Sequence, residues 1–190
     1  MARRAPPLPR GLKAVLPQDR IERRLEELAG EIQRRVSARE RPIAIVVLQG
    51  AFIFAADLLR RLSPGFKLDI AFLRCESYGA GTRSSGRVLL LQDIDHSVNL
   101  AGRTVLLVDD ILDSGLTLRF LVGHLRQRGA GRIRICVLLK RKQPRGTPRI
   151  RPDFCGFSVG PDFVVGYGLD YNGRYRHLPY LAALKATRKR

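Results

Sequence analysis

The sequence lacks the features of a membrane-spanning or exported protein. Its longest apolar stretch, from Ile43 to Leu59, is interrupted by Gln49, Gly50 and Asp57, so it fits a strand followed by a helix better than a membrane span. The first residues, MARRAPPLPRG, are basic and rich in proline and lack the apolar core of a secretion signal. We therefore expect a cytoplasmic protein with no membrane partner.

Cysteine is scarce, and internal repeats are absent. The three cysteines, Cys75, Cys136 and Cys155, are odd in number and have no spacing typical of metal ligands. Without a secretion signal, we expect reduced thiols rather than disulfides or a zinc site. With 190 residues and 45% hydrophobic content, the chain is long enough for one well-buried domain and short for two.

Acidic residues are outnumbered by basic ones. The 17 Asp and Glu against 35 Lys and Arg give a net charge of +18. A field of that sign attracts phosphates, nucleotides and RNA alike, so it does not identify a partner. Much of the excess lies at the two ends and in KRKQPRGTPRIR, residues 140–151. Solvated surface is the favoured interpretation; nucleic-acid binding is the less favoured one, and the basic tails would carry it.

Hydrophobic periodicity predicts strands that alternate with helices. Helical spacing occupies 19–36, with Asp19 as the N-cap, 51–62, and 118–129, which stops at Gly129. Apolar runs typical of buried strands occupy 43–48, 68–75, 87–94, 104–108, 132–140 and 163–171. This alternation predicts an α/β fold with a mostly parallel twisted sheet flanked by helices. Segment 76–86 holds three glycines and predicts a flexible loop.

The stretch VLLVDDILDSGLTL, residues 105–118, places three aspartates within five residues directly after a strand. Carboxylates this close repel one another, so the fold must bring a cation, a proton or a hydroxyl-rich ligand to them. In an open parallel sheet, ligands bind beyond the carboxyl ends of the strands, and this stretch occupies that place. The alternative, that the aspartates are helix caps, is weaker for three aspartates followed by Ser-Gly-Leu-Thr.

The two halves of this stretch suit the two ends of one ligand. Ser114, Gly115 and Thr117 would present hydroxyls and amides at a helix N-terminus, which favours a phosphate. Asp109 and Asp110 suit sugar hydroxyls or Mg²⁺. A ribose 5-phosphate satisfies both halves, and the third aspartate, in the loop between them, is a candidate proton acceptor.

The same stretch resembles the phosphoribosyl-diphosphate signature of type I phosphoribosyltransferases. From about Val15 to Leu184 the chain is similar to the bacterial hypoxanthine-guanine branch of that family, through VLQGAFIFAADLL, LLKRK and DFVVGYGLDYNGRYRHLPYL. The resemblance implies the type I phosphoribosyltransferase fold over 14–184, with a small hood region and a flexible lid loop, between basic tails at 1–13 and 185–190. It also implies transfer of the 5-phosphoribosyl group from phosphoribosyl diphosphate to hypoxanthine or guanine, a purine salvage reaction that yields IMP or GMP and pyrophosphate.

The resemblance assigns ligand contacts by position in these motifs. The ribose 5-phosphate would be bound by Asp109, Asp110, Ser114, Gly115 and Thr117. The pyrophosphate would be bound by Gln49, Gly50 and Arg176, and an arginine fork suits a phosphate. Mg²⁺ is the implied cofactor, with ligands Asp109, Asp110 and Asp170.

The resemblance also assigns the purine site. The 6-oxopurine base would be bound by Lys140, Phe163, Val164 and Asp170. Asp113 would be the base that faces N7 of the purine, and Ser77 and Tyr78 would begin the lid loop. Two positions depart from the family pattern, because Gln49 and Leu116 stand where many relatives have lysine near the phosphates.

Two other functions stay open at this point. An RNA-binding regulator on the same fold is consistent with the net charge, although such relatives usually carry an aromatic residue where Asp113 stands. The same reaction with xanthine or a pyrimidine is the other, although Lys140 and Phe163 favour a 6-oxopurine. Because family members are usually dimers or tetramers, we expect a homodimer or homotetramer.

Overall fold

The computed structural model describes residues 7–78, 87–142 and 149–184. Within these ranges the helices are α1 (Gln18–Arg35), α2 (Phe52–Leu59) and α3 (Leu116–Gln127), with a 3-10 turn η1 (Ala38–Glu40). The strands are β1 (Leu12–Leu16), β2 (Ile43–Leu48), β3 (Asp69–Tyr78), β4 (Arg87–Gln92), β5 (Val105–Leu112), β6 (Ile133–Lys140), β7 (Phe154–Ser158), β8 (Val164–Val165) and β9 (Leu181–Leu184).

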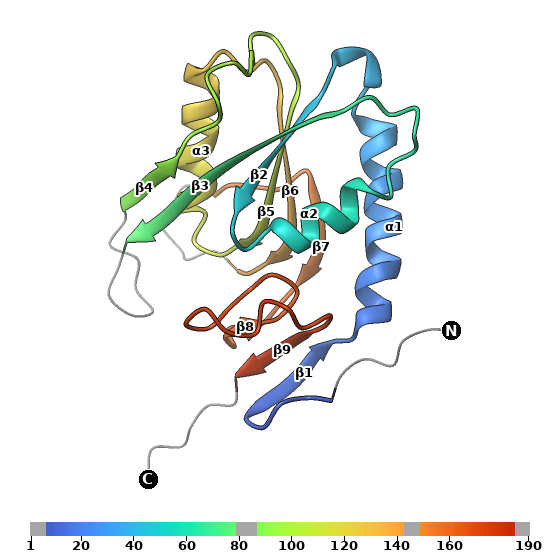
Figure 1. The fold of residues 1–190 in the computed structure, drawn as a ribbon, viewed down its shortest axis with the longest axis vertical. Coiled ribbons are helices and arrows are strands. Elements are labelled where there is room, and N and C mark those ends of the chain that lie inside the picture. The colour runs from blue at the N-terminus through green and yellow to red at the C-terminus, as the bar shows by residue number, and fades with distance from the viewer. Residues whose placement is uncertain (1–6, 79–86, 143–148, 185–190) are drawn as a thin grey trace.

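A six-stranded sheet forms the centre of the molecule, in the order β4-β3-β2-β5-β6-β7. Its neighbouring strands are parallel except for the antiparallel pair β3–β4. Helices α1 and α2 lie on one face and α3 lies on the other, so the central strands are covered on both sides (Figure 1). The predicted mostly parallel sheet flanked by helices is confirmed.

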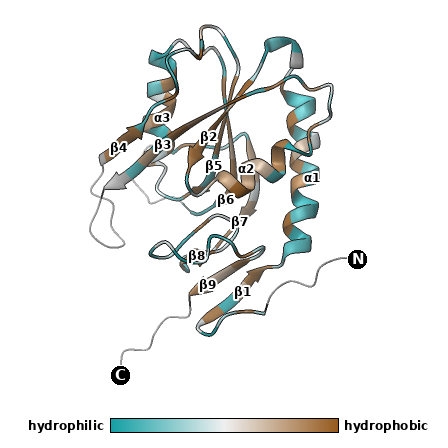
Figure 2. Ribbon diagram, in the orientation of Figure 1, coloured by the Kyte–Doolittle hydropathy of each residue, from teal (hydrophilic) through white to brown (hydrophobic). Residues whose placement is uncertain are grey.

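Alternate side chains of the central strands enter two separate cores. Val46 and Leu106 pack with α1 and α2, whereas Ile45 and Leu107 pack with α3, as the two-residue period of a strand requires. Figure 2 shows the central strands as mainly hydrophobic, while α1 alternates between hydrophobic and hydrophilic residues. Because packing on both faces fixes these strands, it also fixes the positions of the loops at their ends.

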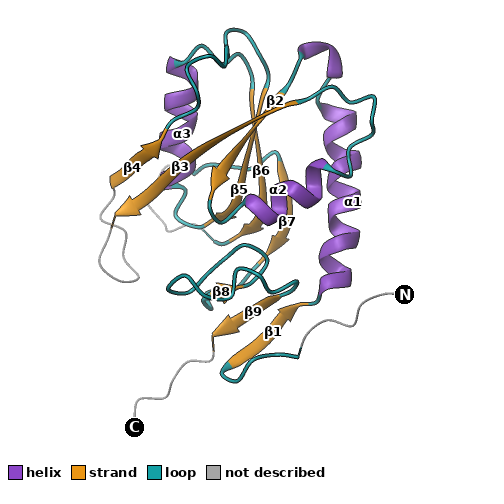
Figure 3. Ribbon diagram, in the orientation of Figure 1, coloured by secondary structure: helices purple, strands orange, loops and turns teal. Residues whose placement is uncertain are grey.

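A second, three-stranded sheet corresponds to the expected hood region. Its order is β1-β9-β8, both pairs are antiparallel, and it lies beyond the carboxyl ends of the parallel strands (Figures 1 and 3). The predicted strand at 163–171 is wrong beyond β8, because Gly166 and Gly168 have φ of +95° and +100° and turn the chain. Strand β1 overlaps the end of the predicted basic tail 1–13, and the domain bounds stay a prediction.

Two predicted boundaries differ from the structure. Pro17 precedes α1 without a side-chain cap, so Asp19 is not the N-cap and lies instead in the first turn, where a carboxylate favours the helix dipole. Strand β3 includes the first three residues of the predicted loop 76–86, because Ser77 pairs with Val88 and Tyr78 pairs with Arg87. Residues 79–86 lie outside the described part of the chain.

The expected thiols and helix end are observed. The three cysteines are free, and Cys136 is buried. Burial, followed by the charges of Asp109 and Asp110, raises the pKa of Cys75 to about 12, which keeps its thiol protonated. Gly129 follows α3 with φ +86°, as predicted for a helix stop. Among the described helices, none combines the length and apolar character of a membrane span.

Candidate functional site

The end of β5 carries two adjacent carboxylates with little access to water. Asp109 is buried at 6% exposure, and Asp110 is half-buried. Burial, followed by the charge of Asp110, raises the pKa of Asp109 well above its ordinary value. Burial also raises the pKa of Asp110, although hydrogen bonds and Arg176 oppose part of the rise. A cation or a hydroxyl-bearing ligand would relieve this repulsion.

Two glycines let three loops meet at Asp110. A Cβ at position 50 would overlap the carboxylate of Asp110, and a Cβ at position 168 would overlap the carbonyl oxygen of Gly50. Gly50 follows the Leu48–Gln49 peptide bond, which is cis, and Gly168 has a positive φ. The turn after β2, the end of β5 and the loop after β8 therefore reach this proximity only because glycine has no side chain.

Arg176 connects the loop after β8 to the acidic pair. Its Nη1 donates to the carbonyl oxygen of Gly168 at 2.7 Å, and its Nη2 lies 2.7 Å from Oδ1 of Asp170. The other oxygen of Asp170 accepts a hydrogen bond from the Gly173 amide at 2.7 Å. The charge of Arg176 also opposes part of the rise in the pKa of Asp110, so this one cation interacts with both Asp110 and Asp170.

The predicted phosphate segment lies where β5 passes into α3. Gly115 is the N-cap residue of α3 with φ +80°, a left-handed conformation that glycine adopts most easily. The amide of Leu116 donates to Oγ of Ser114 at 3.4 Å, and Thr117 lies in the first helical turn. The unpaired amides and the dipole of a helix start favour an anion at this loop.

A second cluster lies at the end of β6. Lys140 is the last residue of that strand and pairs in register with Leu112. Phe163 is 46% exposed, and its ring packs edge-on against Tyr171 with 5.6 Å between centroids. The next residue, Val164, is buried in β8. The exposed ring offers a planar ligand a flat surface, and a lysine at a strand end offers a hydrogen-bond donor.

Arg141 links this cluster to Asp113, and the sequence analysis did not single it out. Its Nη1 lies 3.2 Å from Oδ2 of Asp113, and its Nη2 donates to the carbonyl oxygen of Asp162 at 2.7 Å, next to Phe163. The Asp113 side chain is 58% exposed and that of Arg141 only 18%. Its position directly after Lys140 was the available signal, but the run of basic residues at 140–151 was interpreted as solvated surface.

The structure brings the predicted residues together in two groups. Gly50, Asp110, Asp170 and Arg176 gather at the acidic pair, whereas Asp113, Lys140 and Phe163 lie around Arg141. Tyr171 and Gly168 are further members that the sequence analysis gave no role. Ser77 and Tyr78 end β3, and the loop expected to follow them falls outside the described residues.

The oxygen donors of Asp109 and Asp110 fit a hard divalent cation whose other ligands come from the substrate and water. Among the described residues, no three His, Cys, Asp or Glu side chains gather in the manner of a protein-only metal site. Asp109 and Asp110 offer two carboxylates, and Mg²⁺ commonly takes one or two carboxylates and completes its shell with substrate oxygens and water.

Comparisons with known proteins place this geometry in a family context. Residues 11–172 match the model of the phosphoribosyl transferase domain. The chain is 43% identical over 173 residues to the hypoxanthine-guanine phosphoribosyltransferase of Bacillus subtilis (strain 168), over 91% of this chain and 93% of that protein. It is similar to the crystal structure of a hypoxanthine-guanine phosphoribosyltransferase from Bacillus anthracis with HEPES in the active site (TM-score 0.81, 37% identity, covering 90% of this chain and 97% of that one). It is also similar to a hypoxanthine phosphoribosyl transferase of Trypanosoma cruzi (TM-score 0.83, 34% identity, covering 94% of each chain).

Proposed function

The chain belongs to the phosphoribosyl transferase family, and we propose that it is a purine salvage enzyme that transfers the 5-phosphoribosyl group from phosphoribosyl diphosphate to hypoxanthine or guanine. The products are IMP or GMP and pyrophosphate. The observation that carries this proposal is the pair of clusters at one edge of the sheet, in a chain 43% identical to a hypoxanthine-guanine phosphoribosyltransferase. One cluster suits a phosphorylated sugar and the other suits a planar base. The alternative of an RNA-binding regulator is not favoured, since the relatives are enzymes.

The sugar phosphate binds across the end of β5. Ser114, Gly115 and Thr117 hold the 5-phosphate at the start of α3, where backbone amides and the helix dipole favour an anion. Asp109 and Asp110 accept hydrogen bonds from the ribose hydroxyls, which eases the carboxylate repulsion described above. Asp109 and Asp110, joined by Asp170 once Arg176 releases it, would hold Mg²⁺, which would supply positive charge to the leaving pyrophosphate.

Binding of the pyrophosphate rearranges the Arg176–Asp170 pair. Each of these residues is proposed to contact the ligand or its metal, yet in the structure they contact each other at 2.7 Å. Arg176 therefore exchanges Asp170 for the pyrophosphate, where its planar fork donates two hydrogen bonds. The backbone of Gln49 and Gly50 borders the same site, because Gly50 contacts Asp110 and Gly168. This backbone contribution is the reason that Gln49, in place of lysine, does not abolish binding.

The purine lies against Phe163. Lys140 donates to the 6-oxo group, the Phe163 ring stacks on the base, and the main chain of Val164 contacts the base edge. Tyr171 supports the Phe163 ring from the side. The base attacks C1 of the ribose through N9 as the pyrophosphate leaves. Asp113 accepts or shares the N7 proton during this step.

Two features complete the reaction site. Arg141 orients the exposed carboxylate of Asp113 through its 3.2 Å contact, and its buried Nε has no hydrogen-bond partner among the described residues. Ser77 and Tyr78 lead into the proposed lid, which excludes water from the reactive ribosyl centre.

A panel of bases tests the proposed reaction. Purified protein with phosphoribosyl diphosphate and Mg²⁺ is given hypoxanthine, guanine, xanthine or uracil, and nucleotide formation is followed by absorbance. We expect turnover with hypoxanthine or guanine and none with uracil. Turnover restricted to xanthine or uracil would replace the proposed substrate, and none with any base would remove the enzyme assignment.

We also propose a cytoplasmic homodimer or homotetramer. Strands β3 and β4 carry four exposed apolar side chains, each 44–50% exposed, and an oligomer interface would cover them. They are Ile70, Phe72, Leu89 and Leu91. Sedimentation of the natural chain and of Phe72→Ser tests this: the variant should dissociate toward monomers, whereas equal masses would exclude this surface as an interface.

A further inference from the structure

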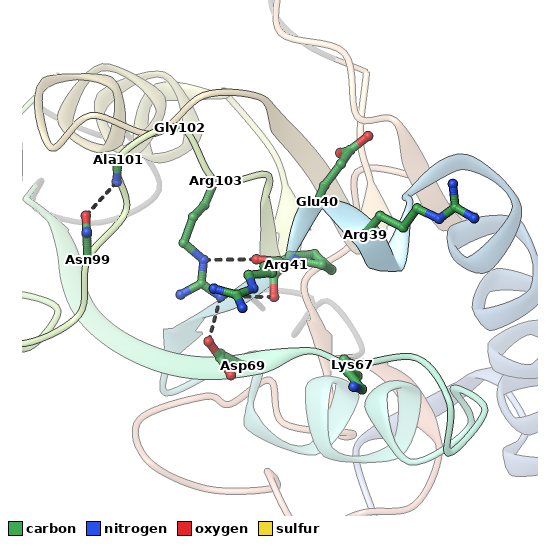
Figure 4. A pocket seen from close by; sticks show the side chains of 10 residues that line it. Arg39, Glu40, Arg41, Lys67, Asp69, Asn99, Ala101, Gly102 and Arg103 are labelled. Atoms are coloured by element: carbon green, nitrogen blue, oxygen red, sulfur yellow. Dashed lines mark hydrogen bonds and ion pairs between the residues drawn. The ribbon is translucent and has the colours of Figure 1, made fainter.

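A pocket lies where the parallel strands of the central sheet begin, opposite the edge that carries the candidate active site. Its volume is about 640 Å³, and it is formed by the segments that lead into β2, β3 and β5. The lining residues are Arg39, Glu40, Arg41, Pro42, Lys67, Asp69, Asn99, Ala101, Gly102 and Arg103 (Figure 4). Four of them are cationic and two are anionic, so the lining carries a formal charge of +2.

Both acidic residues of this pocket already have partners. Asp69 lies 2.6 Å from Nη2 of Arg103, and Glu40 accepts a hydrogen bond from the hydroxyl of Thr104 at 2.5 Å. The side chains of Arg39, Arg41 and Lys67 make no hydrogen bond or ion pair with any described residue. Asp69 neutralises Arg103, whereas the neutral hydroxyl of Thr104 leaves the charge of Glu40 in place. The pocket therefore keeps a net charge of +2, and its cations without partners among the described residues come from two segments far apart in sequence.

The backbone around Arg103 fixes the shape of the pocket. Nε of Arg103 donates to the carbonyl oxygen of Arg41 at 2.9 Å, and Nη2 donates to that of Pro42 at 3.4 Å. Arg41 has φ +47°, a conformation that costs free energy in a residue with a side chain. Arg103 therefore connects the segment before β2 to Asp69 at the start of β3 (Figure 4).

The residue types that line the pocket indicate which class of anion it can bind. It contains no aromatic side chain, so a nucleobase would find no surface on which to stack. The guanidinium fork of Arg41 suits phosphate oxygens, and Lys67 adds a flexible point charge. A volume of about 640 Å³ is ample for several linked phosphates. We propose that this pocket binds a linear polyphosphate group, either as inorganic polyphosphate or as the phosphate tail of a nucleotide.

Binding of inorganic tripolyphosphate to the full chain tests this site by calorimetric titration without Mg²⁺. The test variant is Arg41→Gln/Lys67→Gln. The matched control is Arg20→Gln/Arg23→Gln, which removes the same charge from exposed positions on α1. We expect the test variant to weaken pocket binding at least about tenfold, because it removes two charge-assisted contacts with the phosphates, and the control to change binding less than about twofold. Equal binding by the test variant, or an equal loss in the control, would overturn the proposal.

The active site also binds phosphates, so a third variant separates the two sites. Arg176→Gln removes a proposed pyrophosphate contact at the other edge of the sheet and should leave binding at the pocket unchanged. If Arg176→Gln abolishes all tripolyphosphate binding, the pocket is not a site. The test variant should keep the turnover number and melting temperature of the natural chain, which shows that it is folded.

Two further ligands identify the source of the polyphosphate. ATP is titrated in parallel with tripolyphosphate, and adenosine serves as the base without phosphates. Tighter binding of ATP, lost in Arg41→Gln/Lys67→Gln, assigns the pocket to a nucleotide tail; equal or weaker binding of ATP assigns it to inorganic polyphosphate. Adenosine binding that depends on Arg41 and Lys67 would contradict the phosphate chemistry. So would binding of an RNA oligonucleotide that tripolyphosphate does not displace.

Discussion

The carboxyl edge of the central sheet, where the parallel strands end, and its amino edge, where they begin, differ in how their charged side chains are buried and paired. At the carboxyl edge, Asp109 is buried and Asp110 is half-buried, and Arg176 supplies a cation that Asp110 shares with Asp170. At the amino edge, the acidic residues are paired, while Arg39, Arg41 and Lys67 extend without partners among the described residues. Because an unrelieved charge costs far more free energy when it is buried than when it is solvated, the carboxyl edge gains more from its ligand. The proposed catalytic edge therefore differs from the proposed polyphosphate-binding edge in the burial of its charges as well as in their sign.

The largest effect is expected from an Asp-to-Asn substitution, which can be made at both edges and compared. Asp113→Asn removes the proton acceptor, and turnover should fall by about 100- to 10,000-fold. Binding of phosphoribosyl diphosphate should persist, because the proposed partner of Asp113 is the purine rather than the sugar phosphate. Asp69→Asn makes the same change at the amino edge and should alter turnover less than about twofold. Steady-state kinetics and ligand titration measure both; full turnover in Asp113→Asn would remove its catalytic role.

A glycine-to-alanine substitution should reduce the stability of the protein at the carboxyl edge but not at the amino edge. Gly50→Ala places a Cβ onto the carboxylate of Asp110, so we expect a loss of about 1–3 kcal/mol in the free energy of unfolding, with weaker binding of phosphoribosyl diphosphate. Gly65 lies in the segment leading into β3 and has open space around its Cβ position, so Gly65→Ala should be neutral or slightly stabilising. Chemical denaturation compares the two. Equal stability would show that the Gly50 turn moves freely away from Asp110.

The buried acidic pair should reduce the stability of the ligand-free protein. Since the pKa of Asp109 is raised in the folded state, folding is favoured most below the ordinary carboxyl pKa and loses stability as pH rises toward the folded value. Asp109→Asn removes this dependence and should stabilise the free protein at neutral pH by roughly 1 kcal/mol, while weakening ribose binding. Chemical unfolding of both proteins at pH 4 and pH 7 tests the sign of this stability difference. A variant that is less stable at pH 7 than the natural chain would contradict it.

The smallest effect concerns Arg141. Arg141→Gln removes the contact with an exposed carboxylate, so turnover should fall only about two- to tenfold, the scale of an exposed ion pair. The Michaelis constant for phosphoribosyl diphosphate should not change. Arg39→Gln removes an unpaired charge at the amino edge and should leave turnover intact. If both variants behave alike, Arg141 does not orient Asp113.

Several elements were predictable because their signal is local. The α3 helix, its glycine stop and the buried runs of β2, β5 and β6 follow from periodicity over a few residues. Strand β7 was missed because Gly156 interrupts its apolar pattern; that glycine lies so close to the carbonyl of Leu138 that no side chain fits. Strands β1 and β9 were missed because they are short and stable only through pairing between the two ends of the domain.

The sequence by itself determined the candidate sugar-phosphate segment, because Asp109, Asp110, Ser114, Gly115 and Thr117 follow one another from a strand end into a helix start. Only the tertiary structure decided which partners reach them. Gly50 and Gly168 come from other loops, and Arg141 reaches Asp113 and Asp162 across two more. Their meeting depends on strand order and on close backbone approach, which no local pattern encodes. The unpaired cations at the amino edge gather for the same reason, since parallel strands bring the segments before them to one side.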